Sequence, residues 1–192
     1  MTNKALIAMS GGVDSSVAAF LTKDMGYDAT GITLKLFDNE DIGEKREKTC
    51  CSLDDIDDAR RVCLKLGIPY YVYNFKDSFK ENVIDRFIRA YENGTTPNPC
   101  IDCNRFIKFE KLIRRAEELD FDCVVTGHYS TIEYDKGADR YLLKKSVDST
   151  KDQSYVLYCL TQRQLAKTLL PLGTYTLSLI HISEPTRLDV IS

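Results

Sequence analysis

The stretch Ala5-Leu6-Ile7-Ala8-Met9-Ser10-Gly11-Gly12-Val13-Asp14-Ser15 determines the predicted fold. Its first five residues are a continuous apolar run, which is typical of a strand buried on both faces of a parallel sheet. A second apolar run covers residues 17–21 and is closed by Gly26, which is the pattern of a helix with a glycine after its last turn. The stretch therefore predicts a strand, a tight loop and a helix, in that order.

The loop between this strand and this helix has the composition of an anion-binding site. Ser10, Gly11 and Gly12 place backbone N–H groups at the start of a helix, where the helix dipole favours negative charge. The glycines allow the backbone to come close to phosphate oxygens. Neither the Walker pattern nor the dinucleotide-binding glycine pattern is present. The hypothesis is a nucleotide-phosphate loop of another kind, and an ordinary glycine turn is the alternative.

Strands and helices continue to alternate beyond this first unit. The sequence predicts further strands at residues 29–36, 68–75 and 121–126. It predicts a helix that begins at the capping pair Ser52 and Asp55 and ends at Gly67, and further helices at residues 78–91 and 106–119. Such alternation is typical of an α/β fold with a parallel sheet and right-handed crossovers. After the last of these strands, the sequence predicts a hairpin at residues 130–143 around Lys136-Gly137, followed by a helix at residues 153–169.

The composition is that of a globular chain. With 192 residues and 43% hydrophobic content, the chain is long enough to bury a sizeable core. No apolar run is long enough to span a bilayer, and the first residues do not resemble a signal peptide. We therefore expect a cytoplasmic protein with no membrane partner. In that compartment the seven cysteines are expected to be thiols, metal ligands or catalytic groups rather than a disulfide framework.

Charge is distributed unevenly along the chain. The net charge of -3 argues against indiscriminate nucleic-acid binding. Residues 38–58 are mainly acidic, whereas residues 104–115 are mainly basic. The basic run could face phosphates while the whole chain stays acidic, or both runs could be solvated helix faces. Charge alone leaves both interpretations open.

A second distinctive stretch is Thr96-Pro97-Asn98-Pro99-Cys100-Ile101-Asp102-Cys103-Asn104. Its two prolines predict an extended loop just before the basic helix. Cys103 precedes that expected helix start and two basic residues, and both features lower the pKa of a thiol and favour the nucleophilic thiolate. A Cys-x-x-Cys pair is also compatible with a metal site and with a structural or redox pair. These residues alone leave the three interpretations open.

Short motifs along the chain occur in the order found in one family. They are the loop from Ser10 to Ser16, Cys50-Cys51-Ser52, Ala59-Arg60, Gly67-Ile68-Pro69, Thr96 to Cys103 with Ile107-Lys108-Phe109, Thr126-Gly127-His128-Tyr129 and Lys151-Asp152-Gln153-Ser154-Tyr155. Together they resemble the tRNA-specific 2-thiouridylases, over a span from about Lys4 to about Thr176. The resemblance implies a Rossmann-like parallel sheet of the PP-loop ATP pyrophosphatase (adenine nucleotide alpha hydrolase-like) type.

The resemblance also implies a reaction. In that family the enzyme adenylates the C2 oxygen of the wobble uridine (U34) of certain tRNAs, and a sulfur carried as a cysteine persulfide then displaces AMP. The implied cofactors are ATP and Mg²⁺, with Asp14 as a candidate ligand of the metal. The implied partners are tRNA and a persulfide sulfur donor, such as a cysteine desulfurase or a sulfur-relay protein.

The family's functional residues fall on three groups of positions. The catalytic cysteine corresponds to Cys103. The positions that contact ATP correspond to Ala8, Met9, Ser10, Gly11, Gly12, Val13, Asp14, Ser15, Leu34 and Gly127. The positions that face the target base or the tRNA correspond to Asn98, Pro99, Cys100, Lys151, Asp152 and Gln153.

The chain departs from the family pattern in two places. Many members carry an aspartate at the position of Cys100, so a general-base role there is in doubt. Because thiolates hold iron–sulfur clusters, Cys100 and Cys103 are also candidate ligands of such a cluster. The family's second essential cysteine, the persulfide carrier, belongs to a Gly-x-Cys-Phe-like motif that this sequence does not contain. We expect residues 1–176 to form the PP-loop domain and residues 177–192 to be a tail outside the family pattern.

Other reactive side chains have simpler interpretations. The patterns place Cys63 and Cys159 in helices and Cys123 in a strand, so we expect all three in the core. Cys50-Cys51 is interpreted as a structural pair, with metal ligation as the alternative. His128, at the end of a strand, is either a buried structural histidine or a contact to phosphate or substrate.

Two other functions are compatible with the nucleotide loop. One is an ATP pyrophosphatase amidotransferase similar to GMP synthetase, which would use ammonia, although the Thr-Pro-Asn-Pro-Cys-x-x-Cys stretch argues against it. The other is a non-catalytic fragment that binds ATP or tRNA.

Overall fold

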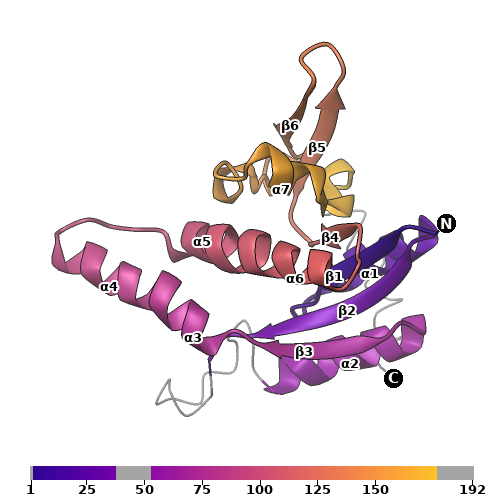
Figure 1. Ribbon diagram of the computed structural model, residues 1–192, viewed down its shortest axis with the longest axis horizontal. Helices are drawn as coiled ribbons and strands as arrows, with labels where there is room; N and C mark the ends of the chain where they lie inside the picture. Colours follow the sequence, from indigo (N-terminus) through magenta and orange to yellow (C-terminus); the bar gives the residue numbers. More distant parts are fainter. Residues whose placement is uncertain (1, 38–52, 177–192) are drawn as a thin grey trace.

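The fold is built around a parallel β-sheet. The computed structural model describes residues 2–37 and 53–176, and within them five strands pair in the order β3-β2-β1-β4-β7 (Figure 1). All neighbouring strands run parallel. The strands are β1 (Lys4–Ala8), β2 (Asp28–Lys35), β3 (Tyr70–Asn74), β4 (Cys123–Val125) and β7 (Thr168–Leu169). The predicted α/β class and the first four strands are confirmed.

Two helices connect the first three strands of the sheet. Helix α1 (Val13–Asp24) follows β1, and helix α2 (Leu53–Leu66) precedes β3. Each ends at a predicted glycine, Gly26 or Gly67, with φ of +84° or +64°. A residue with a side chain rarely adopts such backbone angles, so these glycines stop the helices where the sequence indicates.

Two longer helices follow β3, each with a π-helical segment inside it. The first consists of α3 (Lys76–Phe79), η2 (Lys80–Ile84) and α4 (Asp85–Glu92). The second, which we call the cysteine helix, consists of α5 (Pro99–Asp102), η3 (Cys103–Lys111) and α6 (Leu112–Glu118). In Figure 1 the two helices diverge from each other, and a loop joins α4 to α5.

The cysteine helix begins earlier than predicted. The expected extended loop was wrong for residues 99–104, because the helix starts at Pro99. Proline suits the first helical position, since its missing N–H would have no acceptor there. The Oδ1 atom of Asn98 accepts a hydrogen bond from the Cys100 N–H at 3.0 Å and caps the helix. Cys100 and Cys103 therefore lie within the first turns of the helix and not ahead of it.

The chain after β4 contains one confirmed and one wrong prediction. The hairpin is confirmed, with β5 (Ser130–Asp135) paired to β6 (Arg140–Lys145). The helix predicted at 153–169 is replaced by η4 (Ser154–Val156), α7 (Gln162–Ala166) and strand β7, before η5 (Pro171–Thr174). Thr161 and Gln164 form a capping box, which fixes the start of α7 at Gln162 and not at residue 153.

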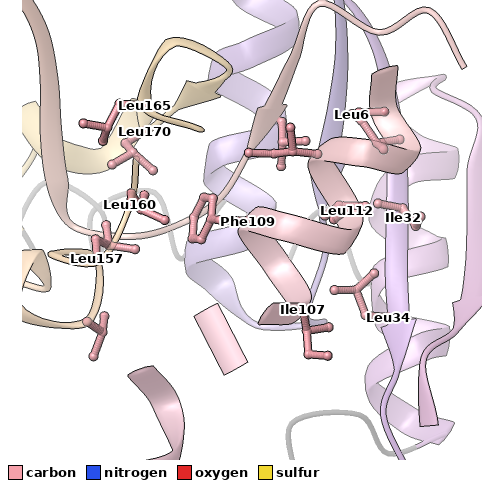
Figure 2. Close-up of a cluster of buried hydrophobic side chains, with 14 of the residues drawn as sticks. Leu6, Ile32, Leu34, Ile107, Phe109, Leu112, Leu157, Leu160, Leu165 and Leu170 are labelled. Atoms are coloured by element: carbon pink, nitrogen blue, oxygen red, sulfur yellow. The ribbon is translucent and has the colours of Figure 1, made fainter. Parts of the chain in front are cut away.

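Buried side chains form a cluster on each face of the sheet. Leu6 of β1 belongs to one cluster, whereas its neighbours Ala5 and Ile7 belong to the other, as the alternation of a strand requires. Figure 2 shows the first cluster, in which Ile107 and Leu112 of the cysteine helix lie near strand residues and Phe109 lies toward a group of leucines from the region around α7: Leu157, Leu160, Leu165 and Leu170. The core therefore joins the cysteine helix both to the sheet and to the α7 region.

The cysteines outside the motif have mixed environments. Cys63 is fully buried, as predicted, whereas Cys123 and Cys159 are only half-buried. Cys159 lies in a turn after η4 and not in a helix. Within residues 2–37 and 53–176, no helix combines the length and apolar character needed to cross a membrane.

Candidate functional site

The candidate site lies where the strand order reverses. From β1 the chain proceeds through β2 to β3 on one side, and β4 then pairs with β1 on the other side. Ligands of open α/β sheets bind at the carboxyl ends of the strands beside such a switch point. The loop at Ser10–Gly12 follows β1, and Gly127 follows β4. Two of the predicted ATP-contacting segments therefore flank the switch point.

The loop from Ser10 to Ser15 is held in shape by its own serines. Ser15 Oγ donates to the Gly12 carbonyl at 2.9 Å, and the Ser10 N–H donates to Ser15 Oγ at 3.1 Å. Gly12 is the N-terminal cap of α1, and no side chain in the described part of the chain caps this helix. The N–H groups of the first helical turn lack intrahelical acceptors, so this end of α1 favours a bound anion such as phosphate.

Two glycines allow close packing around this loop. A Cβ atom on Gly11, which has φ of +77°, would lie 2.4 Å from the Asp55 carbonyl oxygen. A Cβ atom on Gly127 would lie 2.8 Å from the carbonyl carbon of Asp14. These distances are too short for any side chain, so the start of α2 and the segment after β4 pack directly against the loop backbone. The structure thus places Gly127 beside Asp14.

The remaining predicted ATP residues form the support of the loop. Met9 uses its backbone within the sheet, since its N–H donates to Ile32 O at 2.8 Å and its carbonyl accepts from Thr33 Oγ1 at 3.0 Å. Leu34, near the carboxyl end of β2, belongs to the buried cluster in Figure 2. Ala8 and Val13 are half-buried at the two ends of the loop. Direct contact of these residues with ATP stays a prediction.

A buried tyrosine connects the nucleotide loop to a second predicted site segment. The Tyr129 hydroxyl donates to Asp14 Oδ1 at 2.7 Å. The Tyr129 N–H donates to Gln153 Oε1 at 3.0 Å, and the Gln153 N–H donates to the Tyr129 carbonyl at 2.9 Å. Burial, together with the hydrogen bond to Asp14, raises the pKa of Tyr129, so its hydroxyl keeps the proton that it donates. We call these three residues the Tyr129 bridge.

Asp152 shapes the turn that carries Gln153. Its Oδ1 accepts from the Ser146 N–H at 3.1 Å, and its Oδ2 accepts from Ser154 Oγ at 2.7 Å. Partial desolvation raises the pKa of Asp152, but the hydrogen bonds from Ser154 and Ser146 outweigh this and lower the pKa below its ordinary value. Lys151 is exposed beside this anchored turn. Contact of Lys151, Asp152 and Gln153 with tRNA stays a prediction.

Two arginines hold the start of the cysteine helix. The Arg86 Nε lies 3.3 Å from Asp102 Oδ2, which ties α4 to the cysteine helix. The guanidinium groups of Arg86 and Arg105 lie 5.0 and 5.1 Å from the centre of the Phe106 ring, within the range of cation–π attraction. Two positive charges therefore lie near this end of the helix, and that of Arg86 is paired with Asp102.

The two cysteines of the motif differ in exposure. Cys100 is exposed and Cys103 is half-buried, and their spacing places both on one side of the helix. Next to them, Asn104 is buried, and its Oδ1 has no hydrogen-bond partner among the residues that the structure describes. The roles of Asn98, Pro99 and Cys100 toward the target base, and of Cys103 in catalysis, stay predictions.

His128 has the surroundings of a structural histidine. Its Nδ1 lies 2.7 Å from Thr126 Oγ1, and its ring centre lies 5.9 Å from that of Phe109 in the cysteine helix. Burial lowers the pKa of His128 well below its ordinary value, and the nearby charge of Lys108 lowers it further. The imidazole is therefore neutral near pH 7. Of the two interpretations of this residue, the geometry favours the structural one.

The described residues provide only part of an iron–sulfur ligand set. Within residues 2–37 and 53–176, no three His, Cys, Asp or Glu side chains are grouped so that they could hold a metal ion. Cys100 and Cys103 supply two thiolates, whereas clusters are commonly held by four. Cys50, Cys51, the acidic connection at 38–52 and the predicted tail at 177–192 lie outside the described residues. The cluster stays a prediction.

Local sequence patterns predict no role for Tyr129, although it belongs to the motif Thr126-Gly127-His128-Tyr129. The only sequence signal was its place directly after Gly127-His128, since the partner Asp14 lies 115 positions away along the chain. Hydrogen bonds over such separations depend on the fold and do not appear in local patterns.

The chain matches a known protein family over nearly its whole length. The sequence model of the tRNA methyl transferase HUP domain family matches residues 3–189. The chain belongs to this family. The match extends past Thr176 into the segment expected to be a tail, so the boundary between residues 1–176 and 177–192 stays a prediction.

Two curated relatives of this HUP-domain chain carry the same name. The tRNA-specific 2-thiouridylase MnmA of Clostridium beijerinckii is 56% identical over 175 residues, which are 91% of this chain and 48% of the relative. The protein of the same name in Clostridioides difficile is 57% identical over 175 residues, again 91% and 48% of the two chains. The resemblance to 2-thiouridylases is confirmed, and the chain spans about half the length of the curated relatives it matches.

Solved structures agree on the fold of this HUP domain. The U34-tRNA thiolase NcsA from Methanococcus maripaludis, solved with its [4Fe-4S] cluster, gives a TM-score of 0.58 at 19% identity and covers 98% of this chain and 59% of its own. A glutamine-dependent NAD⁺ synthetase from Acinetobacter baumannii gives 0.56 at 12% identity, covering 98% and 29%. At these identities the likeness concerns the fold alone, and it agrees with the predicted α/β fold with a Rossmann-like parallel sheet.

Proposed function

We propose that this chain is the ATP-binding, base-activating part of a tRNA 2-thiouridylase that acts on U34. The observation that carries the proposal is the Tyr129 bridge, which joins the loop suited to phosphate with the Lys151–Gln153 turn at one edge of the sheet. Relatives named tRNA-specific 2-thiouridylase, with 56% identity over 91% of the chain, support the choice of reaction.

The proposed reaction has two steps that balance. The C2 oxygen of the uridine attacks the α-phosphorus of ATP, the bond to the β-phosphate bridge oxygen breaks, and pyrophosphate leaves. The terminal sulfur of a cysteine persulfide then attacks C2, the bond from C2 to the adenylated oxygen breaks, and AMP leaves. The Cys103 thiolate attacks the inner sulfur of the persulfide, so the S–S bond breaks and the terminal sulfur stays on C2 as the 2-thio group. This leaves a disulfide between Cys103 and the carrier cysteine, which an external thiol reductant must reduce. Adenylation is needed because a carbonyl oxygen is a poor leaving group.

Residues of this chain have defined tasks in the first step. The backbone N–H groups at Gly11, Gly12 and the first turn of α1 hold the phosphates and stabilise the charge that passes to pyrophosphate. When bound with ATP, Mg²⁺ neutralises phosphate charge, and the Asp14 carboxylate at the loop suits it as an oxygen ligand. The exposed Lys151 beside the anchored turn is suited to an RNA phosphate.

The second step depends on the cysteine helix. Cys103 is the proposed catalytic thiol, and it lies at the start of the π-helical segment η3, two positions before Arg105. Asn98, Pro99 and Cys100 would face the target uridine, which must leave its stack to reach them. The proposed partners are tRNA and a persulfide donor of the cysteine desulfurase or sulfur-relay class.

Exchange of labelled pyrophosphate into ATP tests the first step. The expected result is exchange that requires an anticodon stem-loop with uridine at the wobble position and that stops when cytidine replaces it. Exchange without RNA would indicate an adenylating enzyme of another kind, similar to an amidotransferase. Binding of ATP and RNA with no exchange would leave a non-catalytic binding domain.

Iron content tests the proposed cluster separately. If Cys100 and Cys103 ligate a cluster, anaerobically purified protein carries iron and loses it in Cys100→Asp, because a carboxylate is a poorer ligand for such clusters. If Cys100 only occupies the position of a family carboxylate, the preparation carries no stoichiometric iron, and Cys100→Asp preserves uridine-dependent exchange.

A further inference from the structure

The Tyr129 bridge connects two ligand segments through a short series of hydrogen bonds. At one end the Tyr129 hydroxyl donates to Asp14, the second residue of α1, at 2.7 Å. At the other end Tyr129 and Gln153 exchange two hydrogen bonds, of 3.0 and 2.9 Å, through the Tyr129 backbone. One residue thus contacts both the nucleotide loop and the turn proposed to bind RNA.

We propose that Tyr129 is a positioning residue that couples RNA binding at the Lys151–Gln153 turn to nucleotide binding at the Ser10–Ser15 loop. This inference rests on the proposed function, since it requires that both ligands bind. It goes beyond that function because Tyr129 touches neither ligand in the proposed roles and acts through Asp14 and Gln153.

The surroundings of Tyr129 limit its freedom to absorb a displacement. The residue is 2% exposed and packs in the buried cluster that also contains residues of β1 and α1. Two positions before it, Gly127 lies against the Asp14 backbone with no room for a Cβ atom. Closely packed groups move together rather than independently, so a shift of Tyr129 is transmitted to Asp14.

The turn at the other end is equally anchored. Asp152 accepts hydrogen bonds from Ser146, which follows β6, and from Ser154. Gln153 therefore extends from a turn of fixed shape. An RNA phosphate that binds Lys151 moves or immobilises this turn as a unit. Its hydrogen bonds carry that change to the Tyr129 peptide and, through the ring, to Asp14.

Coupling of this kind is reciprocal and measurable. If RNA changes the affinity for ATP by a factor, then ATP changes the affinity for RNA by the same factor, and such factors typically lie between about 5 and 150. We expect the wild-type chain to bind a non-hydrolysable ATP analogue with an affinity that a uridine-34 anticodon stem-loop changes by a factor in this range.

Tyr129→Phe removes the hydroxyl and keeps the ring that fills the core. The expected result is a coupling factor below about 2, with folding intact by circular dichroism and thermal unfolding. A purely structural hydroxyl would change both nucleotide affinities equally, with and without RNA, and would leave their ratio unchanged. The ratio of the nucleotide affinities with and without RNA therefore distinguishes a positioning role of Tyr129 from a general loss of stability.

Tyr134→Phe is a matched control. Tyr134 also donates its hydroxyl to an aspartate, Asp139, but this pair lies on the exposed hairpin, away from the nucleotide loop. We expect its coupling factor to equal that of the wild type.

The outcomes distinguish the two proposals. If the wild-type chain binds neither ATP nor RNA, the proposed function fails and the coupling fails with it. If ATP and RNA both bind but the coupling factor of the wild type is near 1, only the coupling is overturned. The same holds if Tyr129→Phe keeps the coupling factor of the wild type. A loss of coupling in Tyr134→Phe as large as in Tyr129→Phe would also overturn it.

Discussion

Gly127 lies at the closest contact between the segment after β4 and helix α1. Its missing side chain leaves room for the carbonyl carbon of Asp14, which a Cβ atom would approach to 2.8 Å. Because this contact involves backbone on both sides, no rotamer change relieves it. We expect Gly127→Ala to lower the free energy of unfolding by about 1–3 kcal/mol, the range of overpacked sites, and to weaken ATP binding.

Urea unfolding and calorimetric titration with an ATP analogue test this expectation. Gly137→Ala is the matched control, because the nearest atom to its added Cβ would be a side-chain oxygen of Asp135, 3.3 Å away on the exposed hairpin. Equal losses of ATP affinity in the two variants would contradict a specific role of the Gly127 contact.

His128 predicts a dependence of stability on pH. Its pKa in the folded chain is well below 6.5, whereas the unfolded chain has an ordinary histidine. Between these two pKa values the unfolded state binds the additional proton. The contribution of His128 is therefore complete above about pH 6.5 and is lost as pH falls toward the folded pKa, with a slope of up to about 1.4 kcal/mol per pH unit.

Urea unfolding between pH 7.5 and pH 5 measures this slope. His128→Gln is expected to reduce it, because glutamine does not titrate. The chain has one other histidine, His181, which provides the comparison. A slope that persists in His128→Gln and disappears in His181→Gln would show that the wrong histidine was chosen.

Single residues were predictable where their role is local. The glycines and serines of the Ser10–Ser15 loop follow from the needs of an anion-binding turn, and the structure gives them that geometry. Tyr129 could not be chosen in this way, because its task depends on Asp14 and Gln153, which approach it only in the folded chain.

At the scale of elements, the start of the cysteine helix depends on Asn98. Its side chain caps the helix through the Cys100 N–H. We expect Asn98→Ala to cost about 1 kcal/mol of unfolding free energy, whereas Asn98→Asp restores the cap and costs little. Thermal unfolding of the two variants checks this difference.

The same pair of variants separates capping from recognition. If Asn98 also faces the target base, Asn98→Asp keeps the helix but replaces an amide by a carboxylate, and uridine-dependent pyrophosphate exchange falls. Exchange at the wild-type rate in Asn98→Asp would restrict Asn98 to capping.

Elements were predictable when their apolar pattern was long and regular. The strands of the sheet from β1 to β4, helices α1 and α2 and the hairpin all follow from such patterns. The two-residue strand β7 is too short to have a period, and its pairing with β4 is decided by the fold. The early start of the cysteine helix was missed because the prolines were interpreted as loop residues, although proline also suits a first helical turn.

For the whole molecule, helix α7 connects parts that are distant in sequence. Gln164 Nε2 donates to the Phe109 carbonyl of the cysteine helix at 2.8 Å, and its Oε1 accepts from the Thr161 N–H at 2.9 Å. Gln162 exchanges hydrogen bonds with the Tyr141 backbone of the hairpin. A five-residue helix is thus bonded to two larger units.

These two glutamines are expected to differ in their effect on stability. Gln164 is half-buried, so Gln164→Leu should cost about 1–2 kcal/mol, because the capping box and the bond to Phe109 are both lost. Gln162 is exposed and water can replace its bonds, so Gln162→Leu should cost less than about 1 kcal/mol. Hydrogen exchange at the Val124 and Thr126 amides, which pair with residues 167 and 169, should accelerate only in Gln164→Leu.

The sequence supported the class of the fold more than the arrangement of its parts. Alternating strands and helices require a parallel sheet, but they do not reveal that the α7 region packs on the cysteine helix. That contact is made by leucines with no distinctive spacing, shown around Phe109 in Figure 2. For the site, the sequence indicated candidate ligand segments, whereas the fold determines which of them are neighbours.

The Tyr129 bridge also has a consequence for biosynthesis. Asp14 leaves the ribosome long before its partner, because Tyr129 is made 115 residues later. At about 5–20 residues per second, the delay is roughly 6–23 seconds. During that time the nascent nucleotide loop lacks both the tyrosine and the Gly127 contact, so it is open to chaperones and proteases. A pause in translation before residue 129 would prolong this exposure.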